Sequence, residues 1–281
     1  AHTRLIRWHY PNIRSCNEII EILNNATFDA ATVKAQIAEA KFLRAWMYLD
    51  MAKRFGGVPL ELSPKSVDAP VEELMIPRST LKETYDQIIS DLDAASADLP
   101  GIVPYGKASK WAAFALKSRA ALYAARIAKY HPQSSNGLTS ITAGDAGSYY
   151  AKSLQAAKAV IDGGKHPLYK GGANMVDRFA EIFYKDQNSE IIFAEQYNRA
   201  LGKTHTWSGY GMPDGFKAGW GSNMHMYLAS DARFEHSDGS PGNKHHAKFN
   251  NNVWFDLEEV IYTKDPRYLA TLFTPEEVFQ G

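Results

Sequence analysis

This chain has almost no cysteine and no net charge. Its 281 residues include a single cysteine, Cys16, which excludes an internal disulfide and a multi-cysteine zinc site. Cys16 lies in an amphipathic helical pattern, so we expect a buried small side chain. Lysine plus arginine and aspartate plus glutamate balance at 31 each, so the chain has no net attraction for nucleic acid or an anionic membrane surface. A charge-neutral partner is therefore favoured, and no nucleic-acid binding is predicted.

Long hydrophobic runs are absent as well. No stretch of 18 apolar residues occurs, so no segment is expected to cross a bilayer as a helix. The chain opens in AHTRLIRWHY, without a basic n-region, an apolar h-region or a cysteine for lipidation. At 45% hydrophobic and 12% aromatic residues, it is nevertheless globular and long enough for a full core plus a second lobe.

The motifs of common catalytic centres are missing too. The sequence contains no G-x-S-x-G elbow, no H-E-x-x-H, no phosphate-binding P-loop and no C-x-x-C. His236, Asp238, His245 and His246 invite a metal-site hypothesis, but adjacent histidines do not share a helix face, so we interpret them as a solvated polar loop. We therefore predict no enzymatic activity, no cofactor and no metal ligands.

The longest helical pattern runs from Ile37 to Pro59, IAEAKFLRAWMYLDMAKRFGGVP. At about 100° per residue it has two apolar faces, one with Phe42 and Leu49 and the other with Met47 and Met51. Two apolar faces require two neighbours, so this helix is expected to lie sandwiched in a helical layer. The closing Gly-Gly-Val-Pro is a strong stop signal.

Further segments have helical periodicity. Thr80 and Glu83 form a capping box that opens a second amphipathic helix. We interpret the aspartates of that helix as a solvated face; they are Asp86, Asp91, Asp93 and Asp98. The other helical segments are expected at Ile13 to Asn25, Ala108 to Lys129, Tyr149 to Ile161 and Met175 to Tyr184, the last two forming a third hairpin.

Small and bulky residues alternate along these helices. Alanines at helical spacing let a neighbouring helix approach closely, while Trp46 and Trp111 are expected to fill the packed layers. That combination is typical of tetratricopeptide-like helical hairpins. The β-branched and aromatic residues of Glu190 to Tyr197 predict a strand that ends the helical layer. The predicted fold is mostly α, with a helical-hairpin scaffold at residues 1–200 and an irregular, Gly- and aromatic-rich second lobe at residues 201–281.

Five segments, in this order, resemble the SusD/RagB family. They are EAKFLRAWMYLDMAKRFGGVPL at Glu39 to Leu60, RSTLKETYDQIISDLDAASADLP at Arg78 to Pro100, GKASKWAAFALKSRAALYAA at Gly106 to Ala125, EIIFAEQY at Glu190 to Tyr197, and KDPRYLATLF at Lys264 to Phe273. Members of this family are outer-membrane lipoproteins of Bacteroidetes-type bacteria that bind nutrients beside a TonB-dependent transporter.

The resemblance implies a non-catalytic, cell-surface lipoprotein of the outer membrane. It implies binding of a neutral oligosaccharide or polysaccharide and delivery to a SusC-like TonB-dependent transporter. Contact with the membrane would come only through an N-terminal lipid anchor that this sequence does not contain, and family members continue well past the DPR segment, so both ends are expected to be truncated. A peptide-binding member of the family and a helical-repeat protein-interaction scaffold remain as alternatives.

The irregular lobe supplies the candidate binding residues. From Asn198 to Asn252 the composition shifts toward glycine, asparagine, serine, histidine and aromatics. Glycine lets backbone approach a ligand, and flat aromatic side chains on a scaffold suit stacking on sugar rings, nucleobases or peptides. We expect Trp207, Tyr210 and Trp220 to stack on the glycan and Asn223 to pair with its hydroxyls. Alternatively, these aromatics form a small cluster that caps the helical layer.

Overall fold

A computed structural model of the chain describes residues 8–27, 29–66, 68–204, 228–246 and 258–271. The chain divides into two compact units, and each is described by itself. The first contains Ala1–Pro167 and Ile192–Ala194, and the second contains Leu168–Ile191 and Glu195–Gly281. The division predicted from the sequence, between residues 200 and 201, stays a prediction.

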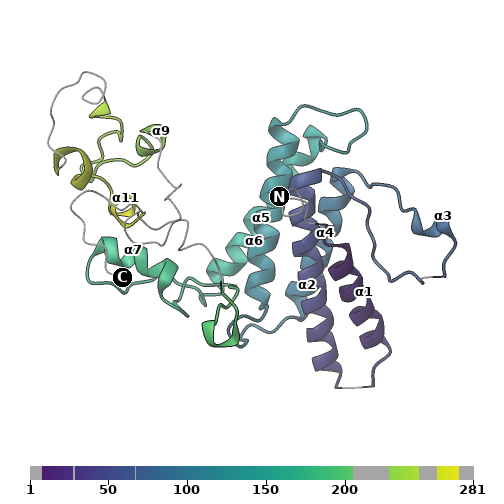
Figure 1. The fold of residues 1–281 in the computed structure, drawn as a ribbon. Coiled ribbons are helices and arrows are strands. Elements are labelled where there is room, and N and C mark those ends of the chain that lie inside the picture. The colour runs from purple at the N-terminus through teal and green to yellow at the C-terminus, as the bar shows by residue number, and fades with distance from the viewer. Residues whose placement is uncertain (1–7, 28, 67, 205–227, 247–257, 272–281) are drawn as a thin grey trace. The chain divides into compact units, whose positions relative to one another are not determined.

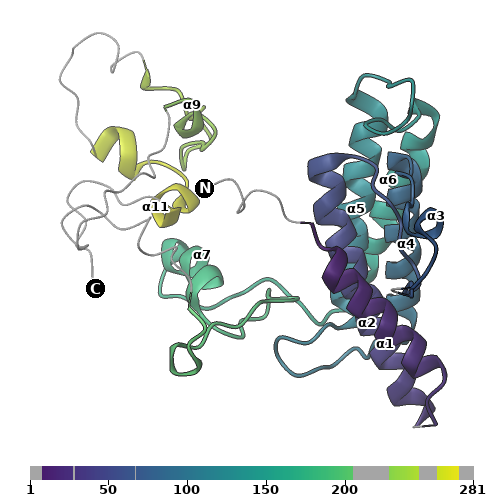
Figure 2. The same cartoon turned by 45° about the vertical axis from the view of Figure 1, so that its right-hand side comes forward.

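The first unit is a layer of helices in which each long helix packs against the next one along the chain. Helix α1 contacts α2, α2 contacts α4, α4 contacts α5, and α5 contacts α6. Figures 1 and 2 show these helices side by side. The predicted mostly α fold with helical hairpins is thereby confirmed. The elements are α1 (Tyr10–Asn24), α2 (Ala30–Phe55), α3 (Val71–Leu74), α4 (Leu81–Asp98), α5 (Lys110–Tyr130), η2 (Ala143–Asp145) and α6 (Ala146–Asp162).

Helix α2 is the centre of this layer. It begins at Ala30, earlier than predicted, because the Asp29 carboxylate caps it by accepting a hydrogen bond of 2.9 Å from the Thr32 backbone N–H. It ends at Phe55, and the C-cap residue Gly56 has a φ of +78°, which is accessible to glycine at little cost. A Cβ at Gly57 would lie 2.1 Å from the Ser79 carbonyl oxygen, so the predicted stop is also a close backbone contact.

The structure confirms other local predictions for the first unit. The capping box of α4 is present: the Thr80 hydroxyl accepts from the Glu83 N–H at 3.2 Å, and the Glu83 carboxylate accepts from the Thr80 N–H at 2.7 Å. Cys16 is buried as expected, and this burial raises the pKa of its thiol. The alanine ridge of α5 is also buried, and it includes Ala113, Ala120 and Ala124.

The two tryptophans expected in packed layers behave differently. Trp111 is buried, and its indole N–H donates a hydrogen bond of 2.9 Å to the Gly101 carbonyl, which confirms the prediction for this residue. The prediction for Trp46 is wrong, because this side chain is 43% exposed. At 100° per residue, Trp46 falls on the solvent strip of α2 together with Asp50, and its ring centroid lies 5.8 Å from that of Phe193 and 6.2 Å from that of Phe42.

The buried side of α2 is one continuous arc and not two separate faces. Arg44 and Tyr48 lie between the two predicted apolar faces, and both are buried. The Arg44 guanidinium forms a bidentate ion pair with Asp91 of α4, with N···O distances of 2.6 and 2.8 Å. Asp91 is buried with it, so the interpretation of Asp91 as part of a solvated face is wrong. A carboxylate is tolerated in this position because a cation from the neighbouring helix neutralises it.

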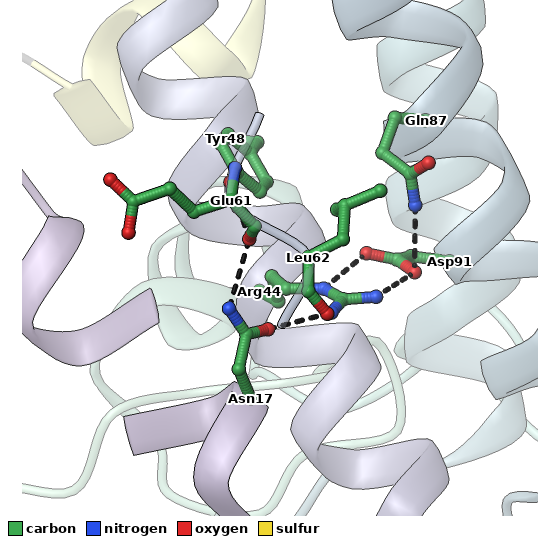
Figure 3. A network of polar contacts seen from close by, with 7 residues as sticks. All are labelled: Asn17, Arg44, Tyr48, Glu61, Leu62, Gln87 and Asp91. Carbon is green, nitrogen blue, oxygen red and sulfur yellow. Dashed lines mark hydrogen bonds and ion pairs between the residues drawn. The ribbon is translucent and has the colours of Figure 1, made fainter. Parts of the chain in front are cut away.

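Figure 3 shows how this ion pair joins three helices and the connector that follows α2. Arg44 Nη1 donates to the Asn17 side-chain oxygen of α1 at 2.7 Å and to the Leu62 carbonyl at 3.3 Å. Gln87 Nε2 donates to the Asp91 carboxylate at 3.1 Å. The Asn17 amide in turn donates to the Glu61 carbonyl at 2.9 Å. The network therefore specifies how α1, α2, α4 and the connector meet.

The predicted third hairpin is wrong. Helix α6 packs back on α5 and buries Tyr149, Ser153 and Ala156, whereas Leu154 and Ile161 are 62% and 74% exposed. Helix α7 (Met175–Tyr184) has the predicted bounds but lies in the second unit, where it contacts α11 (Pro266–Thr271). Sequence periodicity predicted the positions of both helices but not the helix against which each one packs.

The predicted strand at Glu190 to Tyr197 is wrong as well. The structure shows no strand there, and its middle residues, Ile192–Ala194, belong to the first unit. Phe193 lies edge-on to Phe42 with ring centroids 5.2 Å apart, and Ile192 packs on the same core. A β-branched and aromatic run forms a strand only when a partner strand pairs with it. In this protein the run instead packs its apolar side chains, Ile192 and Phe193, on the core of the first unit.

The described part of the second unit consists of short elements. Besides α7 and α11 it contains η3 (Arg199–Leu201), α9 (Leu228–Asp231) and a π-helical turn, η5 (Glu258–Tyr262). Within the described ranges of both units, no helix combines the length and the apolarity that a membrane span requires.

Arg44→Ala should destabilise the first unit by about 3–5 kcal/mol, because it leaves the Asp91 carboxylate buried without its counter-ion. The double variant Arg44→Met, Asp91→Leu should recover much of this loss, since it removes both charges together. Urea denaturation followed by far-UV circular dichroism measures both. Equal destabilisation in the single and the double variant would contradict the importance of the ion pair.

Candidate functional site

The four residues predicted to bind glycan lie outside the described residues. They are Trp207, Tyr210, Trp220 and Asn223, and their placement stays a prediction. The structure does describe the chain on either side of them, at residues 195–204 and 228–246, and the further stretch 258–271. The site is therefore built from the groups that hold these flanking stretches.

A buried lysine lies between the two described stretches 228–246 and 258–271, which follow the predicted glycan-binding residues in the sequence. The side chain of Lys264 is 1% exposed. Its ammonium group donates to the backbone carbonyls of Gly242 at 2.6 Å, Asp231 at 3.2 Å and Phe234 at 3.3 Å. The Asp231 carboxylate lies 3.0 Å away and supplies the counter-ion. Three carbonyls and one carboxylate thus converge on a single cation, which offsets the cost of its burial.

The Asp231 carboxylate has further partners. His246 Nε2 lies 2.8 Å from it. Tyr268 packs on the same ion pair, with its ring centroid 5.4 Å from the Lys264 ammonium. Burial raises the pKa of Asp231, but hydrogen bonds from His246, Lys264 and Tyr268 outweigh burial and hold that pKa below its usual value. Burial and the negative charge of Asp231 raise the pKa of Tyr268. Asp231 is therefore ionised at neutral pH and forms an ion pair with Lys264.

Two histidines pack beside this ion pair. His236 and His245 are buried, and their rings meet edge to face with centroids 5.2 Å apart. His236 Nδ1 pairs with the Thr263 hydroxyl at 2.8 Å, and burial together with nearby Lys264 lowers the pKa of His236. The interpretation of these histidines as a solvated loop is therefore wrong: they form part of a small polar core.

Two backbone stretches run alongside each other under this core. His236 and Lys264 form an antiparallel bridge, and the Ser237 N–H donates to the Thr263 carbonyl at 2.7 Å. The Asp265 N–H donates to the Glu235 carbonyl at 2.9 Å. Among the described residues, no group of histidine, cysteine, aspartate and glutamate side chains has a geometry that could hold a metal ion.

Sequence reasoning missed Lys264 because lysine is almost always solvent-exposed, and nothing in its neighbours' periodicity marks it as buried. The available signal was its position in KDPR, directly before Asp265, which caps α11 by accepting from the Arg267 N–H at 2.8 Å. A residue next to a helix cap has a well-defined backbone geometry, but its burial depends on contacts that are distant in the sequence.

The first unit carries an exposed aromatic stack of its own. The rings of Trp8 and Phe55 are nearly parallel, with centroids 4.3 Å apart, and Trp8 is 49% exposed. Beside them the Asp50 carboxylate pairs with His9 at 3.1 Å and with Arg54 at 3.2 Å. A flat ring next to hydrogen-bonding groups is the chemistry that carbohydrate binding uses, so this stack is a second surface to test.

The chain thus consists of a layer of helical hairpins and a second unit of short elements, a mostly α fold. Residues 2–122 match a SusD-like family described as "Starch-binding associating with outer membrane". A search among curated proteins finds no match.

Solved structures give a likeness over nearly the whole chain. A SusD-like protein from Bacteroides fragilis is 26% identical with a TM-score of 0.73, and the match covers 93% of this chain and 47% of that protein. A SusD-like carbohydrate-binding protein from the same species is 21% identical with a TM-score of 0.69, covering 96% and 46%. A laminarin-binding SusD-like protein is 22% identical with a TM-score of 0.52, covering 69% and 37%.

Residues 2–122 are therefore similar to the SusD-like family, and the chain has the fold of SusD-like proteins, which confirms the resemblance inferred from the sequence. The chain spans about half the length of the first two of these structures.

The thermal stability of the second unit should fall as the pH drops below 6.5, the ordinary pKa of histidine. Because the folded pKa of His236 is lowered, the unfolded state binds the proton more tightly. The stabilisation is complete above pH 6.5 and is lost as the pH falls through the folded pKa. Thermal melts between pH 7.5 and pH 5 measure this. His236→Gln should flatten the dependence, whereas His131→Gln, at an exposed position after α5, should not; equal slopes in both variants would contradict the assignment.

Proposed function

We propose that this protein binds oligosaccharide or polysaccharide nutrients at the bacterial cell surface and delivers them to a partner TonB-dependent outer-membrane transporter. The observation that carries the proposal is the likeness of nearly the whole chain to SusD-like proteins of Bacteroides fragilis, one of which is a carbohydrate-binding protein. The family matched by residues 2–122 is described as starch-binding and associated with the outer membrane, which supports the same class of ligand and the same location.

A neutral glucan is the first ligand to test. The equal numbers of acidic and basic residues favour an uncharged ligand, and a laminarin-binding protein shares this fold. On this proposal the protein is an outer-membrane lipoprotein and does not act on its ligand chemically. The helical hairpins form the scaffold, and the second unit contributes Trp207, Tyr210, Trp220 and Asn223 to the glycan.

A protein-interaction scaffold is the second candidate, and one observation favours it. The short helix α3 and the residue after it carry three exposed apolar side chains: Val71 is 63% exposed, Leu74 45% and Met75 74%. Exposed apolar side chains gathered on one element are typical of protein contact surfaces. This candidate predicts a protein ligand and no glycan binding.

Trp207→Ala and Trp220→Ala should each weaken glycan binding by about 1–3 kcal/mol, the range known for bases stacked on aromatic side chains. Because stacking on a neutral sugar releases no ions, the affinity should change little between low and high salt. Isothermal titration with laminarin oligosaccharides at two salt concentrations measures both effects. Trp46→Ala is the matched control, since Trp46 is half exposed on α2. Parental affinity in both lobe variants would return these residues to a structural role.

The purified protein should leave a bound glucan intact. The sequence has none of the nucleophile, metal or phosphate-binding motifs that were sought, so binding is not expected to be followed by cleavage. Incubation with laminarin and an assay for new reducing ends check this. A release of reducing ends that co-purifies with the protein and persists after a second chromatographic step would show that it is an enzyme.

A further inference from the structure

The connector between α2 and α4 presents the short helix α3 at the outside of the first unit. Before α3, the Arg14 guanidinium of α1 donates to the Lys65 carbonyl at 2.8 Å. After α3, the Arg78 side chain donates to the Gly57 carbonyl at 2.8 Å. Between these anchors, the backbone N–H groups of residues 73–76 donate to carbonyls of residues 70–74. Figure 1 shows α3 standing apart from the long helices. The connector is therefore held at both ends and carries α3 outward.

The exposed surface of α3 is apolar with acidic neighbours. Val71, Leu74 and Met75 are spaced i, i+3 and i+4, so they share one face, and all of them are exposed. Three acidic side chains beside them are also exposed and have no ion-pair partner among the described residues; they are Asp68, Glu72 and Glu73. We call these six residues the α3 patch.

Helix α5 has an exposed stripe of the opposite charge. Its sequence, Lys110–Tyr130, contains no acidic residue. At 100° per residue, its exposed side chains gather on one side of the helix, and we call them the α5 stripe: Arg119, Leu122, Tyr123, Arg126, Lys129 and Tyr130. Arg119 and Arg126 have no ion-pair partner within the part of the chain that the structure describes. Tyrosine, arginine and methionine are enriched where proteins meet, so both surfaces have the composition of contact surfaces.

We propose that these two surfaces bind each other between copies of this chain, with the α3 patch of one copy on the α5 stripe of the next. Both surfaces belong to the first unit, and within one copy both stay exposed, so they do not cover each other. Their charges are opposite, and each offers apolar side chains to the other. Acidic and basic residues balance at 31 each, so no net charge opposes association of the copies. The inference goes beyond the proposed function and does not depend on it.

The contact is head to tail, because the two surfaces differ. An assembly of this kind keeps one unoccupied α3 patch at one end and one unoccupied α5 stripe at the other, so further copies add until a ring closes. The average mass in solution should therefore rise with protein concentration. It should fall at high salt, because salt screens charges that are exposed in the separate copies.

Two double variants test the contact by sedimentation equilibrium over a concentration series. Glu72→Lys, Glu73→Lys gives the α3 patch the charge of the stripe, and Arg119→Glu, Arg126→Glu gives the α5 stripe the charge of the patch. Each should weaken self-association by about tenfold or more, because like charges then face each other across the contact.

A third double variant is the matched control. Glu21→Lys, Asp98→Lys changes the net charge by the same amount as the α3 variant, at exposed positions on α1 and α4. It should associate as the parent does. Circular dichroism compares the helix content of all three variants with that of the parent.

An equimolar mixture of the α3 and α5 variants gives the decisive result. Each reversed surface then meets a surface of opposite charge on the other variant, so the mixture should associate although neither variant does so alone. A parent that stays monomeric over the whole concentration series would overturn the inference. So would parental association in either variant, or a mixture that stays monomeric.

An apolar variant covers the case in which the α5 variant does not fold. Leu74→Ser, Met75→Ser changes no charge and lies at exposed positions outside the core. It should weaken self-association at low and at high salt alike, because it removes apolar surface from the contact. Parental association in this variant would contradict the proposed contact.

Discussion

The guanidinium of Arg44 is buried where three helices meet, and the structure around it must satisfy its charge and its donors. Asp91 supplies two oxygens at 2.6 and 2.8 Å, and Asn17 and the Leu62 carbonyl accept from Nη1. The planar guanidinium has its donors in fixed directions, so it can pair with these acceptors in few arrangements. Apolar contacts along α2 tolerate small shifts of one helix past another, whereas this network does not. We infer that the apolar core provides the stability of the first unit and Arg44 selects its register.

The second unit uses the same physical device with fewer helices. Its described elements are short, and in the described stretches 228–246 and 258–271 a buried cation holds them together. Lys264 collects carbonyls from successive turns, and Asp231 neutralises it while also pairing with His246. An irregular loop exposes many backbone polar groups that regular structure would have paired, so a buried donor with several bonds is an economical way to order it.

The sequence predicted what depends on neighbouring residues and failed where distant residues decide. The capping box at Thr80 and the stop after Phe55 are local, and the structure confirms them. Asp91 and Lys264 were assigned to solvent or overlooked because burial of a charge depends on a partner far along the chain. Phe193 lies in a segment with strand propensity, but it packs on Phe42 and the core of the first unit and pairs with no strand among the described residues. The glycan-binding residues were inferred from composition and family resemblance, and only their flanks are described.

The return of Ile192–Ala194 to the first unit makes that unit discontinuous in the chain. Phe193 covers Phe42 and contacts Trp46, yet it follows α6 and the whole of Leu168–Ile191 in the sequence. A polypeptide that ends before Ile192 would therefore leave the Phe42 side of α2 without this aromatic cover, and exposed apolar surface of that kind favours aggregation. The boundary of the first unit thus lies after Ala194 and not at the end of its last long helix, so a fragment cut after α6 would lack part of its own core.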